Sequence, residues 1–317
     1  MARDRNSRWR CGCLWLVLDV FSLRFPHHSM NRNIHRIGII AKPKLTTVAA
    51  LVHQLTDWCA AHEIQALLDK DTAVLAGQSE GLKRTELVAA SELIVVLGGD
   101  GTLLSVARVL DSHSVPILAV NFGSLGFLTE ITLEETFATL ESVLAGKATT
   151  QARMMIDIEV LRENGCFAQY RALNDVVLTK GALARIIDID VNIDNQFVAT
   201  YKADGLIVST PTGSTAYALS AGGPIVYPTL GAMLVTPIAS HTLTFRALVV
   251  PDGVTVEMSL KATQESVYLT VDGQVGLGLN GEDSIRVRKS AIALELIESS
   301  NKNFFDILRR KLKWGER

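Results

Sequence analysis

The chain has 317 residues, of which 48% are hydrophobic and 20% are charged. This length and balance suffice for two domains with buried cores and exclude a disordered chain. Because the net charge is −2, bulk electrostatics give no reason to expect nucleic acid or an anionic membrane as a partner.

The first 29 residues place arginines before an apolar run at 14–20, which superficially resembles a signal peptide. That run contains Asp19 and lacks a small-residue cleavage site, and the ordered pattern starts directly after Met30. We therefore expect residues 1–29 to be a non-native or disordered extension. No stretch reaches the roughly 18 apolar residues of a membrane span.

Cysteine spacing gives no disulfide framework and no pair of zinc ligands. The four cysteines are Cys11, Cys13, Cys59 and Cys166. Isolated cysteines of this kind are typical of a reducing compartment, so we expect a cytoplasmic protein.

Residues 30–150 alternate between short apolar runs and segments with helical spacing. Strands are expected at 36–42, 64–69, 92–97 and 114–121, with helices between them and a last helix at 133–147. This order predicts an N-terminal Rossmann-like α/β domain with a mainly parallel sheet.

Residues 151–299 change to a period of two. At 187–194, isoleucine or valine alternates with Asp and Asn, as in a half-buried strand, and 155–161, 254–260, 266–275 and 284–288 behave similarly. We expect a second, mostly antiparallel β domain here. Residues 304–314 are expected to form a helix that is basic on one side, and the tail 300–317 is expected to return to the first domain.

The sequence GGDGT at 98–102 follows an apolar strand and precedes helical spacing, with Thr102 as the expected N-cap. An Asp-Gly pair often marks only a hairpin turn, but a hairpin requires a strand on both sides. Glycines at the start of a helix let backbone N–H groups approach a phosphate. Beside a phosphate, Asp100 would take a proton from a hydroxyl or hold a Mg²⁺ ion.

Three further stretches carry candidate polar groups. Residues 203–224 crowd hydroxyls around Tyr217, which suits a ribose and a base, although turn-forming loops have the same composition. Asn174 and Asp175 begin an apolar run and would hold a diol, or form a turn that leads into the strand. Residues 121–130 are a glycine-containing loop with Phe127, or an ordinary βα connection.

One motif matches a known fingerprint but lacks the structural context that the fingerprint requires. GLGLNG at 276–281 matches the dinucleotide fingerprint, but a strand pattern follows it where that fingerprint requires a helix. We interpret it as a β-turn region. The sequence also lacks the P-loop, protein-kinase and HExxH motifs.

Together, GGDGT at 98–102, NFGSLGFLT at 121–129, NDVV at 174–177, the block at 203–226 and HTLTFRALVV at 241–250 resemble bacterial NAD kinase. The resemblance covers about nine-tenths of the chain. It implies phosphoryl transfer from ATP, or from inorganic polyphosphate, to the 2′-hydroxyl of the adenosine ribose of NAD, which gives NADP. It also implies a divalent cation (Mg²⁺) as cofactor and a homodimer or homotetramer.

The resemblance implies roles for individual residues. Asp100 would be the general base, Asn174 and Asp175 would bind the ribose, and Phe127 with Leu128 would wall the adenine. Gly98, Gly99, Gly101 and Thr102 would hold the phosphate donor. The remaining residues expected around NAD are Gly101, Arg185, Lys202, Asp204, Thr215, Ala216, Tyr217, Ala218, Leu219, Ser220 and Gln274. Asp175 departs from the family, which commonly has the longer Glu there.

Two other functions compete with this one. Lipid kinases share the GGDG motif, but the hydroxyl-rich block favours a polar acceptor that carries a sugar. A non-catalytic regulator that binds NAD(P) is the other alternative, and the presence of Asp100 favours catalysis over it.

Overall fold

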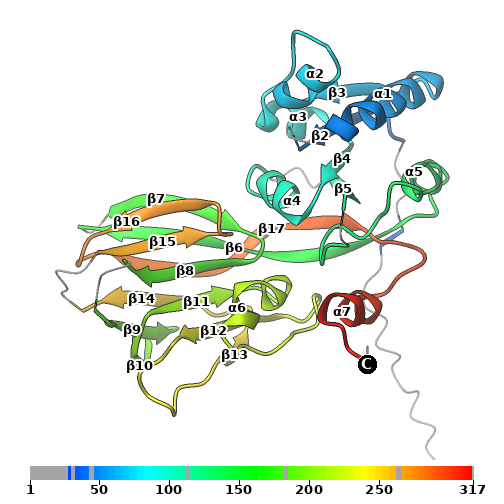
Figure 1. Ribbon diagram of the computed structural model, residues 1–317. Helices are drawn as coiled ribbons and strands as arrows, with labels where there is room; N and C mark the ends of the chain where they lie inside the picture. Colours follow the sequence, from blue (N-terminus) through cyan, green and yellow to red (C-terminus); the bar gives the residue numbers. More distant parts are fainter. Residues whose placement is uncertain are drawn as a thin grey trace, which may run out of the picture.

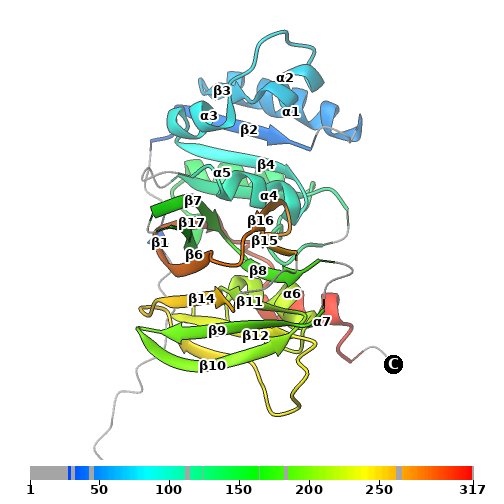
Figure 2. The same ribbon diagram turned by 90° about the vertical axis from the view of Figure 1, so that its left-hand side faces the viewer.

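The computed structural model describes residues 28–29, 33–42, 46–110, 115–123, 125–163, 165–181, 185–261 and 266–315 (Figure 1). Within them the strands form an 11-stranded sheet and a 6-stranded sheet. An α/β part lies above a β part in Figure 2. The expectation for residues 1–29 lies outside the described residues except for β1 (His28–Ser29), which pairs with the strand at 149–162.

The α/β part contains the four strands expected from the sequence, which run parallel in the order β3-β2-β4-β5. They are β2 (Arg36–Ala41), β3 (Gln65–Leu68), β4 (Leu93–Gly98) and β5 (Pro116–Asn121). The helices are α1 (Thr46–Ala61), α2 (Lys70–Leu75), α3 (Arg84–Ala90), α4 (Asp100–Ala107) and α5 (Thr136–Leu144). The prediction of a parallel α/β domain is therefore confirmed.

This parallel sheet is buried on both faces, as apolar strands require. In β4, Leu93, Val95 and Leu97 pack into one core cluster with residues of α1 and α5. Ile94 and Val96 pack into another with residues of α3 and α4. The continuous apolar run is thus explained by helices on both sides of the sheet.

The β part is a sandwich of antiparallel strands, as the period of two predicted. Its elements are β6 (Thr149–Arg162), β7 (Gly165–Ala172), β8 (Asp175–Lys180), β9 (Ile187–Ile193), β10 (Gln196–Ala203), β11 (Gly205–Ser209), β12 (Ala232–Ile238), β13 (Leu248–Pro251), β14 (Val256–Leu260), β15 (Val267–Val271), β16 (Val275–Leu279) and β17 (Ser284–Ile297). Side chains of both sheets share one core cluster, including Ile189 from one sheet and Leu206 from the other.

Two long strands join the parts. β17 pairs with β6 from Ser284 to Ile297, and near its end it also pairs in parallel with β5, where Glu295 lies opposite Pro116. The 11-stranded sheet therefore continues from one part into the other. β6 begins at Thr149 and so spans the expected boundary at 150, whereas β17 ends at Ile297, before the expected boundary at 299. Both boundaries stay predictions.

The tail forms helix α7 (Phe304–Leu312), as the sequence predicted. Just before it, Lys302 donates to the carbonyl of Glu130 at 3.0 Å and forms an ion pair with Glu135 at 2.6 Å. The ring of Phe304 meets that of Tyr227 edge to face at 5.2 Å. The tail therefore contacts both parts. In the described chain, no helix is both long and apolar enough to cross a membrane.

Candidate active site

The turn between β4 and α4 places Asp100 at the first position of the helix. Gly99 is the N-cap, so the expectation that Thr102 caps this helix is wrong. Thr102 lies in the first turn, and its side chain fills the space that a Cβ at Gly98 would need. A carboxylate at this end also interacts favourably with the helix dipole, which the capping pattern alone did not reveal.

Residues 127–129 of the predicted loop surround the carboxylate of Asp100. Asp100 Oδ1 accepts hydrogen bonds from Leu128 N at 3.2 Å, Thr129 N at 3.1 Å and Thr129 Oγ1 at 3.0 Å. Its Oδ2 accepts one from Phe127 N at 3.0 Å. Since a carboxylate has about four acceptor positions, Oδ2 is the oxygen better able to accept a proton from a ligand.

Gly126 makes this arrangement possible. A Cβ at this position would overlap both Asp100 Oδ1 and Thr129 Oγ1. The sequence marked Asp100 and the 121–130 loop as separate candidates, but it did not show that one holds the other. The glycine before Phe127 was the only local signal of such a close approach.

A cavity of about 450 Å³ lies in the β part, and Asn174, Asp175, Ala216, Tyr217 and Asp272 are among the residues that line it. Asp272, which the sequence did not single out, organises this cavity. Its carboxylate accepts the backbone N–H groups of Leu173 at 3.1 Å, Asn174 at 2.8 Å and Asp175 at 3.2 Å. The side chain from the β15–β16 turn thus fixes the start of β8.

Burial of Asp175, which is 3% exposed, raises the pKa of its carboxyl to about 7. The nearby charge of Asp272 raises this pKa further, whereas a hydrogen bond from the Tyr217 backbone lowers it. Burial also raises the pKa of Asp272. The two acids are therefore a closely coupled pair, and one of them retains a proton toward neutral pH.

Gln274 connects this cavity to the Asp100 turn. Its Nε2 donates to the carbonyl of Gly101 at 2.9 Å, and its Oε1 accepts from Arg108 Nη2 at 2.7 Å. The structure thus brings Gln274 beside the Asp100 turn. Arg108, at the C-cap of α4, carried no signal in the sequence because its partner is 166 residues away.

The hydroxyl-rich block folds into a 3₁₀ helix (Thr212–Thr215) and α6 (Tyr217–Ser220). Thr210 Oγ1 donates to the carbonyl of Leu173 at 2.6 Å, and Ser214 Oγ donates to that of Pro211 at 2.6 Å. Both residues are fully buried with their hydroxyls bonded to backbone carbonyls, which agrees with the alternative of a turn-forming loop for these two hydroxyls. They position the backbone around Asn174, against which Gly213 packs without room for a Cβ.

The expected NAD-binding residues of this block divide by exposure. Tyr217 is 44% exposed and lines the cavity with Ala216, whereas Ala218 is fully buried. Thr215, Leu219 and Ser220 are at least partly exposed nearby. The turn that carries Tyr217 is therefore the part of the block that presents a side chain to a ligand.

Three expected residues do not join this cavity. Lys202 forms an ion pair with Asp188 at 3.7 Å, Asp204 forms one with Lys180 at 3.5 Å, and Arg185 is exposed. Within the described chain none of the three lines it. The motif at 276–281 is also explained, because β16 covers its first residues and the strand β17 follows.

Comparisons with known proteins agree with this architecture. The family model of the ATP-NAD kinase N-terminal domain matches residues 37–148, and that of the C-terminal domain matches residues 173–299. The NAD kinase of Solibacter usitatus is 46% identical over 284 residues, which cover 90% of this chain and 99% of that protein. The NAD kinase of Geobacter sulfurreducens is 46% identical over 282 residues, with 89% and 99% covered.

Solved structures give the same result. Yeast NADH kinase complexed with NADH superimposes with a TM-score of 0.83 at 26% identity, with 90% of each chain covered. An NAD kinase from Archaeoglobus fulgidus in complex with ATP shares the fold, with a TM-score of 0.70 at 24% identity and coverage of 87% of this chain and 99% of that one. The chain belongs to the NAD kinase family, and its activity is the phosphorylation of NAD to NADP.

Proposed function

We propose that the protein transfers the terminal phosphoryl group of ATP to the 2′-hydroxyl of the adenosine ribose of NAD, with Asp100 as the general base. The observation that carries this proposal is the setting of Asp100. Its Oδ1 is held by three donors, whereas Oδ2 has a single N–H donor among the described residues. Oδ2 can therefore accept the proton of a ribose hydroxyl placed beside it.

The acceptor nucleotide occupies the cavity at Asn174 and Asp175 in this proposal. The side chain of Tyr217 offers an aromatic face for the base, and Asn174 and Asp175 offer polar groups for the ribose. Gln274 supports the assignment because it joins the hairpin beside this cavity to Gly101. Acceptor and base then meet where the two parts of the molecule adjoin.

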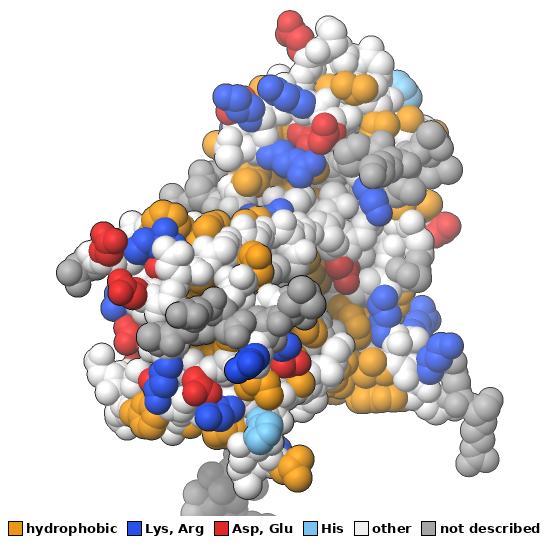
Figure 3. Space-filling model, turned by 60° about the vertical axis from the view of Figure 1, so that its left-hand side comes forward, with side chains coloured by type: hydrophobic (Ala, Val, Ile, Leu, Met, Phe, Trp, Pro, Cys, Tyr) orange, Lys and Arg blue, Asp and Glu red, His pale blue; other side chains and the backbone are white. Residues whose placement is uncertain are grey.

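The donor's phosphates lie against the turn at 98–102 and the first turn of α4, where backbone N–H groups favour anions. Basic side chains support this placement. Lys and Arg gather over α7 at the right of Figure 3, and Lys311 Nζ lies 5.7 Å from the centre of the Phe127 ring. Inorganic polyphosphate likewise presents negatively charged phosphates and is the alternative donor.

A divalent cation completes the proposal. No group of three or more His, Cys, Asp or Glu side chains in the described residues could hold a metal ion. Asp100 is already engaged by four donor groups, so a protein-only metal cage does not fit this turn. We place Mg²⁺ on the donor's phosphates, whose charge it neutralises when bound.

The test is NADP formation by the purified protein with NAD and Mg²⁺, supplied with ATP in one arm and polyphosphate in the other. A coupled NADP-specific dehydrogenase reports the product. Asp100→Asn should lower kcat by about 10²- to 10⁴-fold, because a positioned base contributes that much. Asp57→Asn removes an exposed carboxylate of the same domain and should retain wild-type kcat.

Two results would contradict the proposal. Absence of NADP with either donor rejects the reaction, and near-normal turnover by Asp100→Asn rejects the role of the base. Unchanged circular dichroism of the variant shows that its fold is intact.

The assembly and its location are part of the same proposal. We place a homodimer or homotetramer, as the resemblance implies, in the cytoplasm, as the cysteine usage predicts. Leu243 is 85% exposed and Phe197 is 64% exposed, so both side chains are available for apolar contacts between copies. Light scattering on the purified protein measures the assembly, and a monomeric mass would contradict it.

A further inference from the structure

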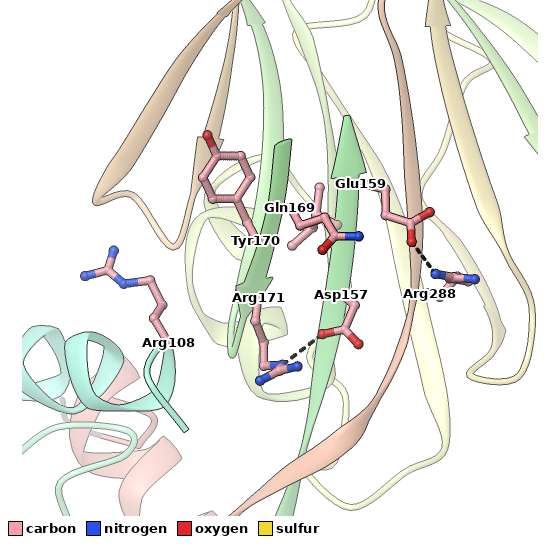
Figure 4. A pocket seen from close by; sticks show the side chains of 8 residues that line it. Arg108, Asp157, Glu159, Gln169, Tyr170, Arg171 and Arg288 are labelled. Atoms are coloured by element: carbon pink, nitrogen blue, oxygen red, sulfur yellow. Dashed lines mark hydrogen bonds and ion pairs between the residues drawn. The ribbon is translucent and has the colours of Figure 1, made fainter. Parts of the chain in front are cut away.

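A second cavity, of about 490 Å³, lies between the end of α4 and the face of β6, β7 and β17 (Figure 4). It shares none of its lining residues with the cavity at Asn174 and Asp175. Figure 4 shows Arg108 on one side and the strand side chains on the other. The charged and aromatic side chains that line it are Arg108, Asp157, Glu159, Tyr170, Arg171 and Arg288.

The strand side chains of this cavity neutralise one another. Asp157 lies opposite Arg171 in the sheet register, and Arg171 Nε contacts its Oδ1 at 2.8 Å. Arg288 Nη2 contacts Glu159 Oε1 at 2.5 Å. Both acids therefore have an arginine partner within the cavity, whereas Arg108 has none among the described lining residues and its charge acts on Asp272 outside it.

Arg108 is also incompletely paired. Its Nη2 donates to Gln274, but its Nη1 is buried and has no hydrogen-bond partner among the described residues. A buried guanidinium N–H without an acceptor is destabilising, and such groups call for a specific explanation. A bound molecule that offers a hydrogen-bond acceptor to Nη1 would explain the unpaired group.

We propose that this cavity is a second ligand site, which binds a small organic anion through Arg108 Nη1. The volume is within the usual range for small-molecule sites. A carboxylate or a phosphate supplies the missing acceptor, while Tyr170 and the stem of Arg171 supply apolar surface for the rest of the ligand. The shared chemistry is thus a negatively charged oxygen group on a compact molecule.

The site adjoins the active site without overlapping it. The guanidinium that offers Nη1 to the ligand holds Gln274 with Nη2, and Gln274 holds the carbonyl of Gly101. A bound anion therefore contacts the same side chain that connects the cavity hairpin to the Asp100 turn.

Isothermal titration of the full chain with inorganic phosphate, and separately with succinate, tests the site. At least one probe should bind, and Arg108→Gln should weaken it about 10- to 100-fold through the loss of a charged hydrogen bond. Glu159→Gln should strengthen it by up to about tenfold, because a repelling charge is removed and Arg288 is released. Arg36→Gln, which removes a surface arginine paired with Glu92, should bind as the wild type does.

Arg108→Gln should weaken binding of the probe and Glu159→Gln should strengthen it. This opposite change in affinity distinguishes binding in this cavity from phosphate binding at the active site, which Glu159 does not line. Binding of phosphate alone supports a phosphorylated ligand, and binding of succinate alone supports a carboxylate. Binding of neither probe overturns the proposal, as does an equal effect of Arg108→Gln and Glu159→Gln. If Glu159→Gln melts at a lower temperature than the wild type, Asp157→Asn is titrated in its place and should also bind the probe more tightly than the wild type.

Discussion

Asp100 and Asp175 both lie beside the end of a strand at the candidate active site, but their surroundings differ. Asp100 sits at the start of α4 and accepts four hydrogen bonds from the loop at 127–129. Asp175 is buried beside a second acid, Asp272, and its pKa is raised to about 7. Hydrogen-bond donors dominate around the first carboxyl, and burial dominates around the second.

This difference separates two tasks that residue type alone does not distinguish. Hydrogen bonds orient Asp100 and leave Oδ2 as the oxygen best able to meet a hydroxyl. Burial keeps a proton on the pair formed by Asp175 and Asp272, so a neutral carboxyl can donate a hydrogen bond as well as accept one. Asp100 therefore suits proton abstraction, whereas Asp175 suits recognition.

The largest expected effect tests the burial of Asp175. Its carboxyl has an ordinary pKa of 3.8 and a pKa of about 7 in the folded protein. Between these values the folded state binds a proton that the unfolded chain has released, so the free energy of unfolding falls as pH rises. In the wild type the free energy of unfolding should fall by on the order of 3 kcal/mol as the pH rises between these values, and Asp175→Asn should abolish this fall.

Urea unfolding at about pH 5 and about pH 8 measures how the free energy of unfolding of Asp175→Asn depends on pH. Asp57→Asn, an exposed control, should keep the wild-type dependence. If wild type and Asp175→Asn change equally between the two pH values, Asp175 is not the protonated group and the contrast with Asp100 fails.

The second prediction concerns the loop that holds Asp100. In Gly126→Ala the new Cβ would overlap Asp100 Oδ1, so the loop or the carboxylate must move. We expect kcat/KM for NAD to fall about 10²-fold, as displacement of a reacting group by about 1 Å can cause. Gly123→Ala is the matched control, because its Cβ has no neighbour nearer than 4.0 Å. Equal activity of the two variants would show that the loop does not position Asp100.

The third prediction addresses the connection between the two regions. Gln274→Ala removes both the bond to Gly101 and the acceptor of Arg108. Loss of the bond to Gly101, which joins the two regions, should lower kcat/KM about tenfold, as expected for one hydrogen bond. Gln54→Ala, on the exposed side of α1, should leave it unchanged. Wild-type kinetics in Gln274→Ala would mean that the two regions are positioned independently.

The smallest effect distinguishes structural from ligand-binding hydroxyls. Ser214 Oγ donates to Pro211 and accepts from Val226 N at 3.0 Å, so Ser214→Ala should lower the free energy of unfolding by about 1 kcal/mol. KM for NAD should stay the same. Ser220→Ala, an exposed change in the same block, should leave stability unchanged. A large rise in KM with no loss of stability in Ser214→Ala would restore its role as a ligand group.

Most of the fold could be predicted from the sequence because the periodicity of apolar residues reflects local burial. Residues 187–193 alternate in the sequence and alternate in exposure as β9. The turn at 98–101 was likewise recognisable from a strand, glycines and a helix in succession. Motif resemblance then indicated the family, which the comparisons confirmed.

Periodicity and motifs therefore predicted the elements, their class and the candidate carboxylates. Packing set which groups bind these carboxylates and the residues beside them: Thr129 donates to Asp100 from 29 residues away, and Asp272 accepts from Asn174 98 residues away. It also turned the hydroxyls of Thr210 and Ser214 inward, where sequence composition had suggested a ligand. Hydrogen bonds between distant segments leave no periodic signal, because their partners come together only when the sheets and helices pack.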